Sequence, residues 1–243
     1  MFSQTRGIKL DIGYSFFNNN LDEIKRSLFP IAPFVHKIHA VNGRCKYYNA
    51  YPGSNFSYED SALIETLPNA KVYYYTGAEH EKRQVYLDAA VGADFLLVLD
   101  TDEWIYSVDW TKLYEELEFL KNDPYLNNKD PYYLFRVNIY FHKDFEVAWN
   151  NVNPETWQTY DRLIRNPTEI QYDLTHYSYT KKQDDYKHNW LSSPSFHKLQ
   201  NLTIQSSSNL RNRHVLDFRK KWKFNLTVEE SQSVINAVAK GIH

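Results

Sequence analysis

Two patterns of apolar and polar positions alternate along the first hundred residues. Short runs dominated by apolar residues predict four strands, over residues 8–17, 36–41, 70–75 and 94–100. Between these runs, apolar side chains recur near helical spacing and predict helices over residues 21–35, 58–67 and 79–90. This succession of strands and helices with short connections is typical of a parallel sheet built by right-handed crossovers.

The fourth predicted strand, Asp-Phe-Leu-Leu-Val-Leu-Asp at residues 94–100, is continuously apolar between its terminal aspartates. Such a run is expected of a central parallel strand that is covered on both faces. In open sheets of this kind, ligands bind outside the carboxyl ends of the strands. The residues at the end of this strand are therefore the first candidates for a functional site.

The pattern changes after residue 109. We expect a helix at 110–121, strands at 132–142 and 199–205, and a loop rich in Trp and Asn at 143–160. We interpret 162–165 and 169–172 as a hairpin around Asn166-Pro167, 180–195 as irregular, and 209–224 and 227–240 as helices. The simplest organisation is one α/β domain over residues 1–200 and a C-terminal helical extension, 201–243, packed on the same domain.

Composition and charge narrow the class of protein. The chain has 243 residues, of which 42% are hydrophobic, so it is long enough to bury a substantial core. Its formal net charge of -2 argues against a nucleic-acid-binding protein, and its one cysteine excludes an intramolecular disulfide and a cysteine-based zinc site. No apolar run reaches the length of a signal peptide or of the about 20 residues in a membrane span, so we expect a cytoplasmic protein.

Two carboxylates stand at the end of the fourth predicted strand, in the segment Asp100-Thr101-Asp102. Residues two apart on a strand point to the same side, so both carboxylates are expected to face one ligand. Hard oxygen ligands of this kind suit Mg²⁺ or Mn²⁺, which waters and substrate phosphates then complete. A metal there would neutralise a diphosphate leaving group. The alternative is that these aspartates are ordinary turn and capping residues.

The sequence around this segment resembles that of a known family. Residues 81–84 (Glu-Lys-Arg-Gln), 89–94 (Ala-Ala-Val-Gly-Ala-Asp) and 95–103 (Phe-Leu-Leu-Val-Leu-Asp-Thr-Asp-Glu) are similar to the core of family 2-type glycosyltransferases with the GT-A fold. The resemblance is close over residues 8–105 and loose over 130–178. It implies an α/β fold with a Rossmann-like, mostly parallel central sheet flanked by helices.

The resemblance also implies an activity. A sugar, of hexosyl type, would pass from a nucleotide-diphosphate sugar to a glycan, lipid or protein acceptor, with Mn²⁺ or Mg²⁺ as cofactor. Lys82, Arg83 and Asp100 would contact the donor, and Asp100 and Asp102 would hold the metal. Asn42 stands where the family often has an aspartate that contacts the nucleoside, so an amide replaces that carboxylate. For Lys82 and Arg83, the alternative is a solvated helix face with acidic neighbours.

A second local match lies downstream. Arg162-Leu-Ile-Arg165 and the residues 170–176 are similar to a later strand pair of the family, in which a carboxylate and a histidine follow an arginine-rich run. By this match, Asp173 would take the proton of the attacking hydroxyl in an inverting displacement, and His176 would complete the metal site. His214 is a rival ligand. The alternatives are that Asp173 caps a turn and that His176 is an ordinary surface or core histidine.

A run of basic residues spans 211–223. We interpret it as the solvated face of a helix. Peripheral contact with an anionic membrane surface is the alternative.

Two other functions compete with the transferase. Phosphohydrolases of the haloacid-dehalogenase type also end an apolar strand in Asp-Xaa-Asp, where the first Asp is a nucleophile. They usually carry the motif on the first strand, however, and follow it with Thr or Val where this chain has Trp104. The other rival is a catalytically inactive protein that binds nucleotide sugars, which the amide at Asn42 favours.

Overall fold

The computed structural model describes residues 7–17, 21–44, 54–122, 133–141, 157–172, 179–182 and 198–206. The strands of its central sheet are β1 (Leu10–Phe16), β2 (Lys37–Asn42), β3 (Ala70–Tyr74), β4 (Phe95–Asp100), β5 (Glu103–Val108), β6 (Leu134–Phe141), β7 (Trp157–Arg165) and β10 (Lys198–Ser206). The helices are α1 (Leu21–Leu28), α2 (Tyr58–Ile64), α3 (Glu79–Ala89) and α4 (Trp110–Asn122). A small second sheet pairs β8 (Ile170–Tyr172) with β9 (Tyr179–Lys181).

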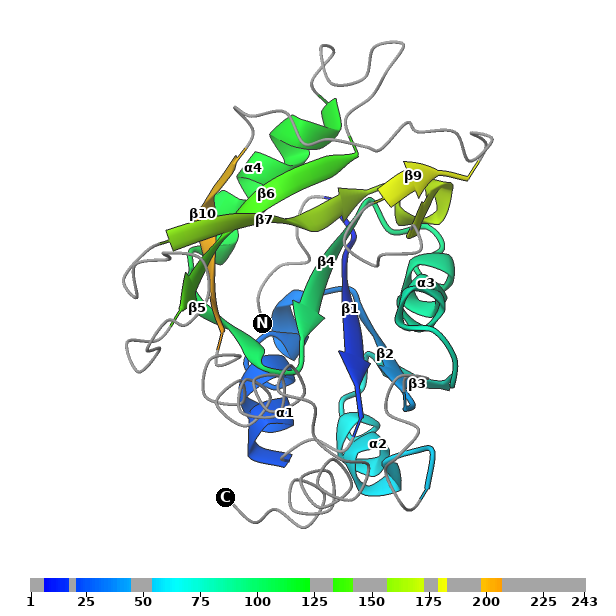
Figure 1. Ribbon diagram of the computed structural model, residues 1–243. Coiled ribbons are helices and arrows are strands. Elements are labelled where there is room, and N and C mark those ends of the chain that lie inside the picture. The colour runs from blue at the N-terminus through cyan, green and yellow to red at the C-terminus, as the bar shows by residue number, and fades with distance from the viewer. Residues whose placement is uncertain are drawn as a thin grey trace, which may run out of the picture.

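The order of strands in the central sheet is β3-β2-β1-β4-β7-β6-β10-β5 (Figure 1). The chain moves outward from β1 to β2 and β3, and then returns through α3 to place β4 on the other side of β1. The pairs β1–β2, β2–β3 and β1–β4 are parallel. The connections that leave β1 and β4 therefore lead to opposite sides of this strand pair, toward β2 and toward β5, and the carboxyl ends of these two strands form a topological switch point.

The other half of the sheet contains both strand directions. β7 runs antiparallel to β4 and β6, whereas β6 and β10 are parallel and β5 is antiparallel to β10. Only β7 and β5 thus oppose the remaining strands of this sheet. The predicted α/β fold with a mostly parallel central sheet flanked by helices is confirmed.

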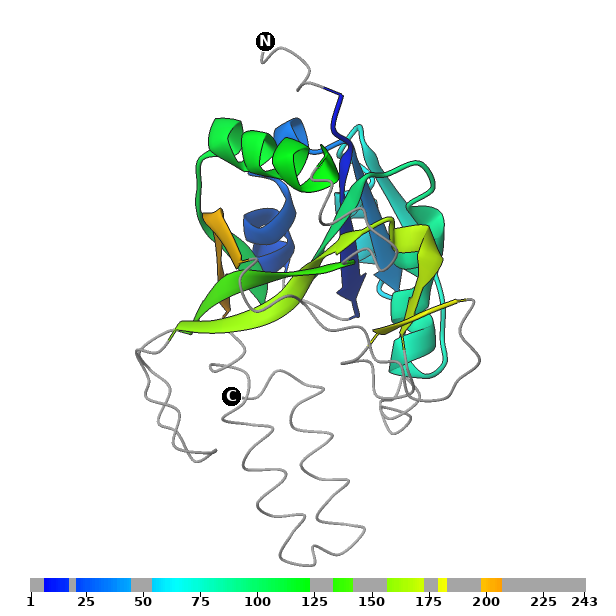
Figure 2. The same cartoon turned by 90° about the horizontal axis from the view of Figure 1, so that it is seen from above.

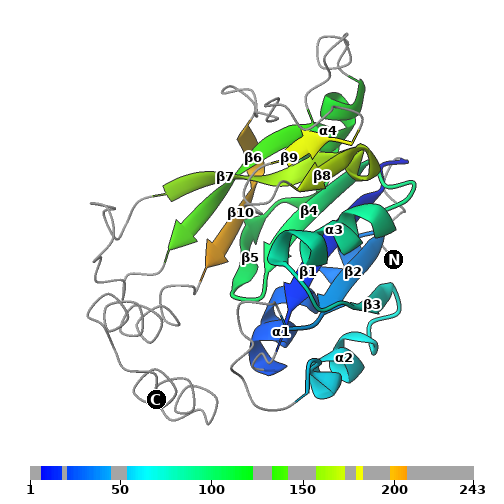
Figure 3. The same cartoon turned by 45° about the vertical axis from the view of Figure 1, so that its right-hand side comes forward.

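Helices cover both faces of the sheet. One core cluster joins the sheet to α1, α2 and α4, and includes Ile24, Ile64 and Leu117. The other joins it to α3 and to the β8–β9 pair, and includes Tyr86 and Tyr172. Figure 2 shows α1 and α4 on one side of β1 and α3 on the other, and Figure 3 shows β8 and β9 beside α3. The central strands are buried on both faces, as their apolar runs predict.

The predicted hairpin of residues 162–165 with 169–172 is wrong. β7 pairs with β4 and β6, whereas β8 pairs with β9. Asn166 adopts a left-handed conformation with φ 46, and Pro167 then begins a short 3-10 turn, η3 (Pro167–Glu169). This turn sends the chain out of the central sheet and toward α3, so the two segments do not meet.

Three further expectations need correction. The segment 143–160, expected as a loop, already contains the start of β7 at Trp157. β5 and β9 lie in segments where no strand was expected. The domain boundary between residues 200 and 201 falls inside β10, a strand of the central sheet, so 201–206 are not part of a helical extension. Residues 207–243 lie outside the described residues, as do both predicted C-terminal helices.

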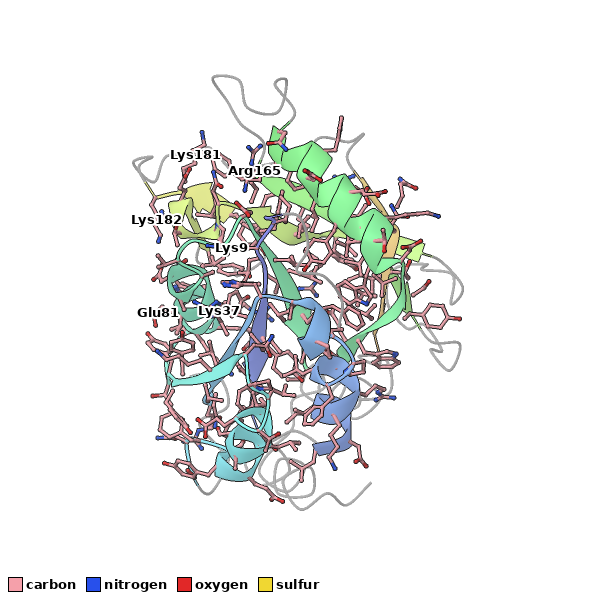
Figure 4. All side chains as sticks on the ribbon, turned by 180° about the vertical axis from the view of Figure 1, so that it is seen from behind. Lys9, Lys37, Glu81, Arg165, Lys181 and Lys182 are labelled. Atoms are coloured by element: carbon pink, nitrogen blue, oxygen red, sulfur yellow. The ribbon has the colours of Figure 1, made fainter. Side chains whose placement is uncertain are left out.

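Basic side chains gather at the amino ends of the central strands. Lys9 precedes β1, Lys37 begins β2, and Arg165 pairs with the first residue of β4 (Figure 4). Lys181 and Lys182 lie at the end of β9 on the same side of the molecule. These residues are at the edge opposite to the switch point and do not contribute to a site there. In the described part of the chain, no helix is long and apolar enough to cross a membrane.

A buried carboxylate links the starts of β1 and β2. Asp11 is 0% exposed; its Oδ2 accepts a hydrogen bond from His39 Nε2 at 2.8 Å, and its Oδ1 is 2.8 Å from Nδ1 of His36. Asp11→Asn is expected to lower the free energy of unfolding by about 2 kcal/mol, because the new amide group would face a histidine donor. Urea unfolding measures this change. A change no larger than that of Asp22→Ala, whose side chain is 86% exposed, would contradict the prediction.

Candidate functional site

β4 delivers Asp100 to the switch point on the α3 face of the sheet. Leu97 and Leu99 pack into the core on the α1 side, whereas Leu96 and Val98 pack toward α3. By this alternation Asp100 also points toward α3. Its backbone is paired with Ser15 near the end of β1, so its carboxylate stands where β1 and β4 both end.

Arg83 reaches the same carboxylate from α3. Its Nη2 lies 2.7 Å from Oδ1 of Asp100 and 3.0 Å from Oε1 of Glu79, which also accepts from Nε at 3.2 Å. The first turn of α3 is held by Glu81, whose Oε2 accepts hydrogen bonds from the backbone N–H of Ala78 and the hydroxyl of Tyr75 (Figure 4). The guanidinium is therefore set in place by the start of a capped helix.

Arg162 approaches from β7. Leu163 pairs with Leu97 of β4, so Arg162 lies one residue further toward the carboxyl end of β4. Its Nη2 is 2.9 Å from Oδ2 of Asp100 and 2.5 Å from Oε1 of Glu103. Asp100 thus has one guanidinium on each carboxylate oxygen. This cluster of Arg83, Arg162, Asp100 and Glu103 is called the arginine–carboxylate cluster below.

Glu103 closes the turn that follows β4. Its Oε2 accepts a hydrogen bond from the backbone N–H of Asp100 at 2.9 Å, and its backbone oxygen accepts one from the hydroxyl of Ser27 at 2.6 Å. The residue is only 3% exposed. The turn between β4 and β5 is consequently tied to α1 and to the cluster, and Asp102 lies in it, half-buried.

Burial and neighbouring charges shift the pKa values of Asp100 and Glu103. Burial alone would raise the pKa of Asp100, but the charges of Arg83 and Arg162 outweigh it and hold that pKa well below its ordinary value. Burial raises the pKa of Glu103 to about 7; Arg162 opposes this rise, and the negative charges of Asp100 and Asp102 add to it. The carboxylates of the cluster therefore differ: Asp100 is held ionised, and Glu103 changes charge near neutral pH.

Two other predicted donor-binding residues make hydrogen bonds inside the protein. Lys82 is 2% exposed and its Nζ donates to the backbone oxygen of Phe16, at the end of β1, at 2.7 Å. Asn42, 0% exposed, donates from Nδ2 to Ser57 O and to Ser61 Oγ, and its Oδ1 accepts from Ser57 N. Asn42 is the last residue of β2, and Lys82 reaches the end of β1 from α3. Their contacts with a nucleotide stay predictions.

The predicted catalytic base Asp173 lies outside the described residues, as do His176 and its rival His214. The short strands that flank residues 173–178 are described, however. Tyr172 and Tyr179 are register partners, and their hydroxyls form a buried network with that of Tyr86 on α3. This network attaches the β8–β9 pair to the helix that carries Arg83.

The described residues do not fit a divalent metal as they stand. A metal would need oxygen ligands that are open to it, whereas each oxygen of Asp100 is within 2.9 Å of a guanidinium nitrogen. In the described ranges, no three His, Cys, Asp or Glu side chains form a group suited to a metal ion. Metal binding by Asp100, Asp102 and His176 therefore stays a prediction, and no chemical step below depends on it.

Reasoning from sequence alone did not assign Arg162 and Glu103 to the site. Arg162 entered only as part of a local match, and Glu103 only as the residue after the second aspartate. The available signal was that Glu103 directly follows the motif. The contacts of Arg162 with Asp100 and Glu103 depend on β7 lying beside β4, although the two strands are separated by more than 50 residues in the chain.

Comparisons with known proteins give low similarity. No family model and no curated protein matches the sequence. A crystal structure of S. aureus TarS 1–349 has 11% identity and a TM-score of 0.42, covering 94% of this chain and 69% of that one. The same TarS segment in complex with UDP has 13% identity and a TM-score of 0.43, covering 94% and 70%. Its complex with UDP-GlcNAc has 13% identity and a TM-score of 0.34, covering 60% and 37%. Similarity at this level identifies neither a family nor a function.

Proposed function

We propose that this chain is a glycosyltransferase that moves a sugar from a nucleotide-diphosphate sugar to an acceptor. The observation that carries the proposal is the arginine–carboxylate cluster at the switch point between β1 and β4. Parallel sheets bind their ligands at such a point, outside the carboxyl ends of the strands. The sequence signature of the family, Asp-Thr-Asp-Glu after the apolar strand, coincides with this place.

The chemistry of the cluster suits a phosphorylated donor. Guanidinium groups present several N–H donors in a plane and bind phosphate oxygens in pairs. Arg83 and Arg162 come from different elements, so their spacing is set by the fold and not by local chain flexibility. A nucleoside diphosphate that leaves the sugar gains negative charge, and fixed cations at this edge would stabilise it.

In the proposed reaction, the acceptor hydroxyl attacks the anomeric carbon of the donor sugar. The bond to the nucleoside diphosphate breaks, and a base takes the hydroxyl proton. We propose an inverting transfer with Asp173 as this base, because Asp173 directly follows Tyr172, which the tyrosine network attaches to α3. The acceptor class, glycan, lipid or protein, and peripheral membrane contact through residues 211–223 stay predictions.

Nucleotide sugars are expected to raise the melting temperature of the protein, since a ligand that binds only the native state stabilises it. A panel of UDP, GDP and other nucleotide sugars, tested with and without Mn²⁺, measures this shift. The same incubations, followed for release of nucleoside diphosphate, measure turnover. Release of inorganic phosphate from phosphate esters would favour the phosphohydrolase, and binding without turnover would favour the inactive binding protein.

In Mn²⁺, Asp102→Ala is expected to weaken binding of the stabilising nucleotide at least about tenfold if Asp102 holds a metal, and to leave it unchanged if the arginines alone hold the diphosphate; Asp22→Ala is expected to leave it unchanged in either case. Both are single aspartate truncations, but Asp22 is a highly exposed residue of α1. Calorimetric titration of each variant measures the affinity. If no nucleotide sugar stabilises the wild-type protein, the proposed site is wrong; if Asp102→Ala binds as the wild type does, the prediction that Asp102 is a metal ligand is wrong.

A further inference from the structure

Two cations share one half-buried anion at the switch point. Nη2 of Arg83 and Nη2 of Arg162 lie 2.7 and 2.9 Å from the two oxygens of Asp100. The side chain of Asp100 is 25% exposed, whereas those of Arg83 and Arg162 are 11% and 16% exposed. The carboxylate is thus the member of this group that lies nearest to solvent.

One hydrogen-bond donor of Arg162 is unused. Its Nε is buried and finds no hydrogen-bond partner among the described residues. A buried donor without an acceptor is costly, because it has lost its hydrogen bond to water. Nε and Nη2 lie on the same edge of a guanidinium, the edge that binds two oxygens of a phosphate or carboxylate side by side. Asp100 uses only Nη2 of this edge.

Each arginine also contacts an acidic side chain other than Asp100. Glu79 binds Nε and Nη2 of Arg83 from the same helix. Glu103 binds Nη2 of Arg162, and its other oxygen is held by the backbone N–H of Asp100. If Asp100 turned away, these two contacts would keep the guanidiniums in place. The pair is therefore an anion site that the protein's own carboxylate occupies.

We propose that Arg83 and Arg162 bind the diphosphate of the donor in place of a divalent metal, and that the diphosphate displaces the carboxylate of Asp100 from them. The inference rests on the proposed function and specifies how the donor is held. A phosphate offers oxygens to both Nη2 groups and also to the unpartnered Nε of Arg162, which the carboxylate leaves unused. In this arrangement the arginines neutralise the leaving group, and the carboxylate of Asp100 is its competitor.

Inorganic pyrophosphate is the probe that tests this inference without a sugar or a base. Calorimetric titration of the wild-type protein in EDTA is expected to show binding, with an affinity within about threefold of that in Mn²⁺, after correction for metal bound by free pyrophosphate. Binding should weaken with increasing salt, as expected for guanidinium–phosphate contacts. Binding that requires Mn²⁺ or Mg²⁺ and vanishes in EDTA would overturn the inference.

Asp100→Asn distinguishes a site in which Asp100 competes with the ligand from a site in which Asp100 binds a metal. If Asp100 competes with the ligand, the variant should bind pyrophosphate about tenfold more tightly, since a neutral amide leaves the guanidiniums to the phosphate. If Asp100 is a metal ligand, the same change should weaken binding in Mn²⁺. Asp88→Asn, at an exposed aspartate near the other end of α3, is the matched control and should bind as the wild type does. The test in EDTA uses the wild-type protein and holds even if the variant folds poorly.

Different results would contradict the glycosyltransferase function and the metal-free diphosphate site. If nucleotide sugars bind and turn over only with Mn²⁺, the glycosyltransferase stands and the metal-free diphosphate site is wrong. If pyrophosphate binds in EDTA but no nucleotide sugar stabilises the protein, the anion site stands and the proposed function is wrong. If pyrophosphate binds under neither condition, the inference is wrong whatever the enzyme transfers.

Discussion

Arg162→Ala is expected to lower the free energy of unfolding by about 4 kcal/mol at pH 7, because removing one partner of a buried ion pair leaves the other charge buried without compensation. Arg162 serves two carboxylates, with Asp100 at 2.9 Å and Glu103 at 2.5 Å, and its own side chain is only 16% exposed. Its loss also removes the opposing charge that limits the pKa of Glu103, so Glu103 should retain its proton to higher pH. Urea unfolding, followed by far-UV circular dichroism, measures the change.

Arg136→Ala is the matched control for this prediction. Arg136 lies on the neighbouring strand β6, its side chain is 42% exposed, and its contact with Asp161 is 3.7 Å long. Exposed ion pairs contribute roughly 0–1 kcal/mol, so this variant should differ little from the wild type. Equal losses in both variants would mean that the arginine–carboxylate cluster is no more important to stability than a surface pair. Pyrophosphate titration of the two variants adds an independent readout, since only Arg162→Ala should lose binding.

Stability is expected to fall as the pH rises from about 5 to about 8, owing to Glu103. The pKa of Glu103 is raised by burial from its ordinary value of 4.5 to about 7 in the folded protein. The native state therefore binds the proton more tightly than the unfolded chain does. Its contribution to stability is complete below pH 4.5 and is lost as the pH approaches and passes 7. The difference between the two pKa values corresponds to about 3 kcal/mol.

The contribution of Asp100 to stability has the opposite pH dependence, and it changes at lower pH. Its pKa is lowered by Arg83 and Arg162, so the stability that it contributes is present above its ordinary pKa of 3.8 and is lost as the pH falls below that value. Unfolding free energies at pH 5, 6, 7 and 8, for the wild type and for Glu103→Gln, test the contribution of Glu103. The variant should lack the fall between pH 5 and 8. The same fall in both proteins would show that another group causes it.

Local sequence was enough to predict the first half of the fold. The apolar runs around β1, β2, β3 and β4 are strands, α3 and α4 each differ from their predicted bounds by one residue, and α2 ends three residues before its predicted end. In these segments, the periodicity of the side chains and the burial of the strands on both faces indicate the same structure. Prediction was poorer for β5 and β7, whose mixed polar and apolar residues belong to strands only because other strands lie beside them.

The carboxylates of the candidate site were predictable, but their partners were not. An aspartate after a buried parallel strand is a local feature, and so is the Lys82-Arg83 pair on a helix. That Arg83 faces Asp100 while Lys82 turns to the end of β1 depends on how α3 crosses the sheet. A difference of one residue on a helix changes the direction of a side chain by about 100°, and only packing determines which of the two faces the site.

The sequence by itself determined that this chain forms an α/β sheet whose fourth strand ends in Asp100-Thr101-Asp102, because side-chain periodicity and continuous burial act over a few residues at a time. Only the tertiary structure decided what that end of the strand faces. It brings β7 to the side of β4 and places Arg162 against Asp100 and Glu103. Ion pairs between residues far apart in the chain depend on strand order and register, and these follow from the packing of the whole sheet.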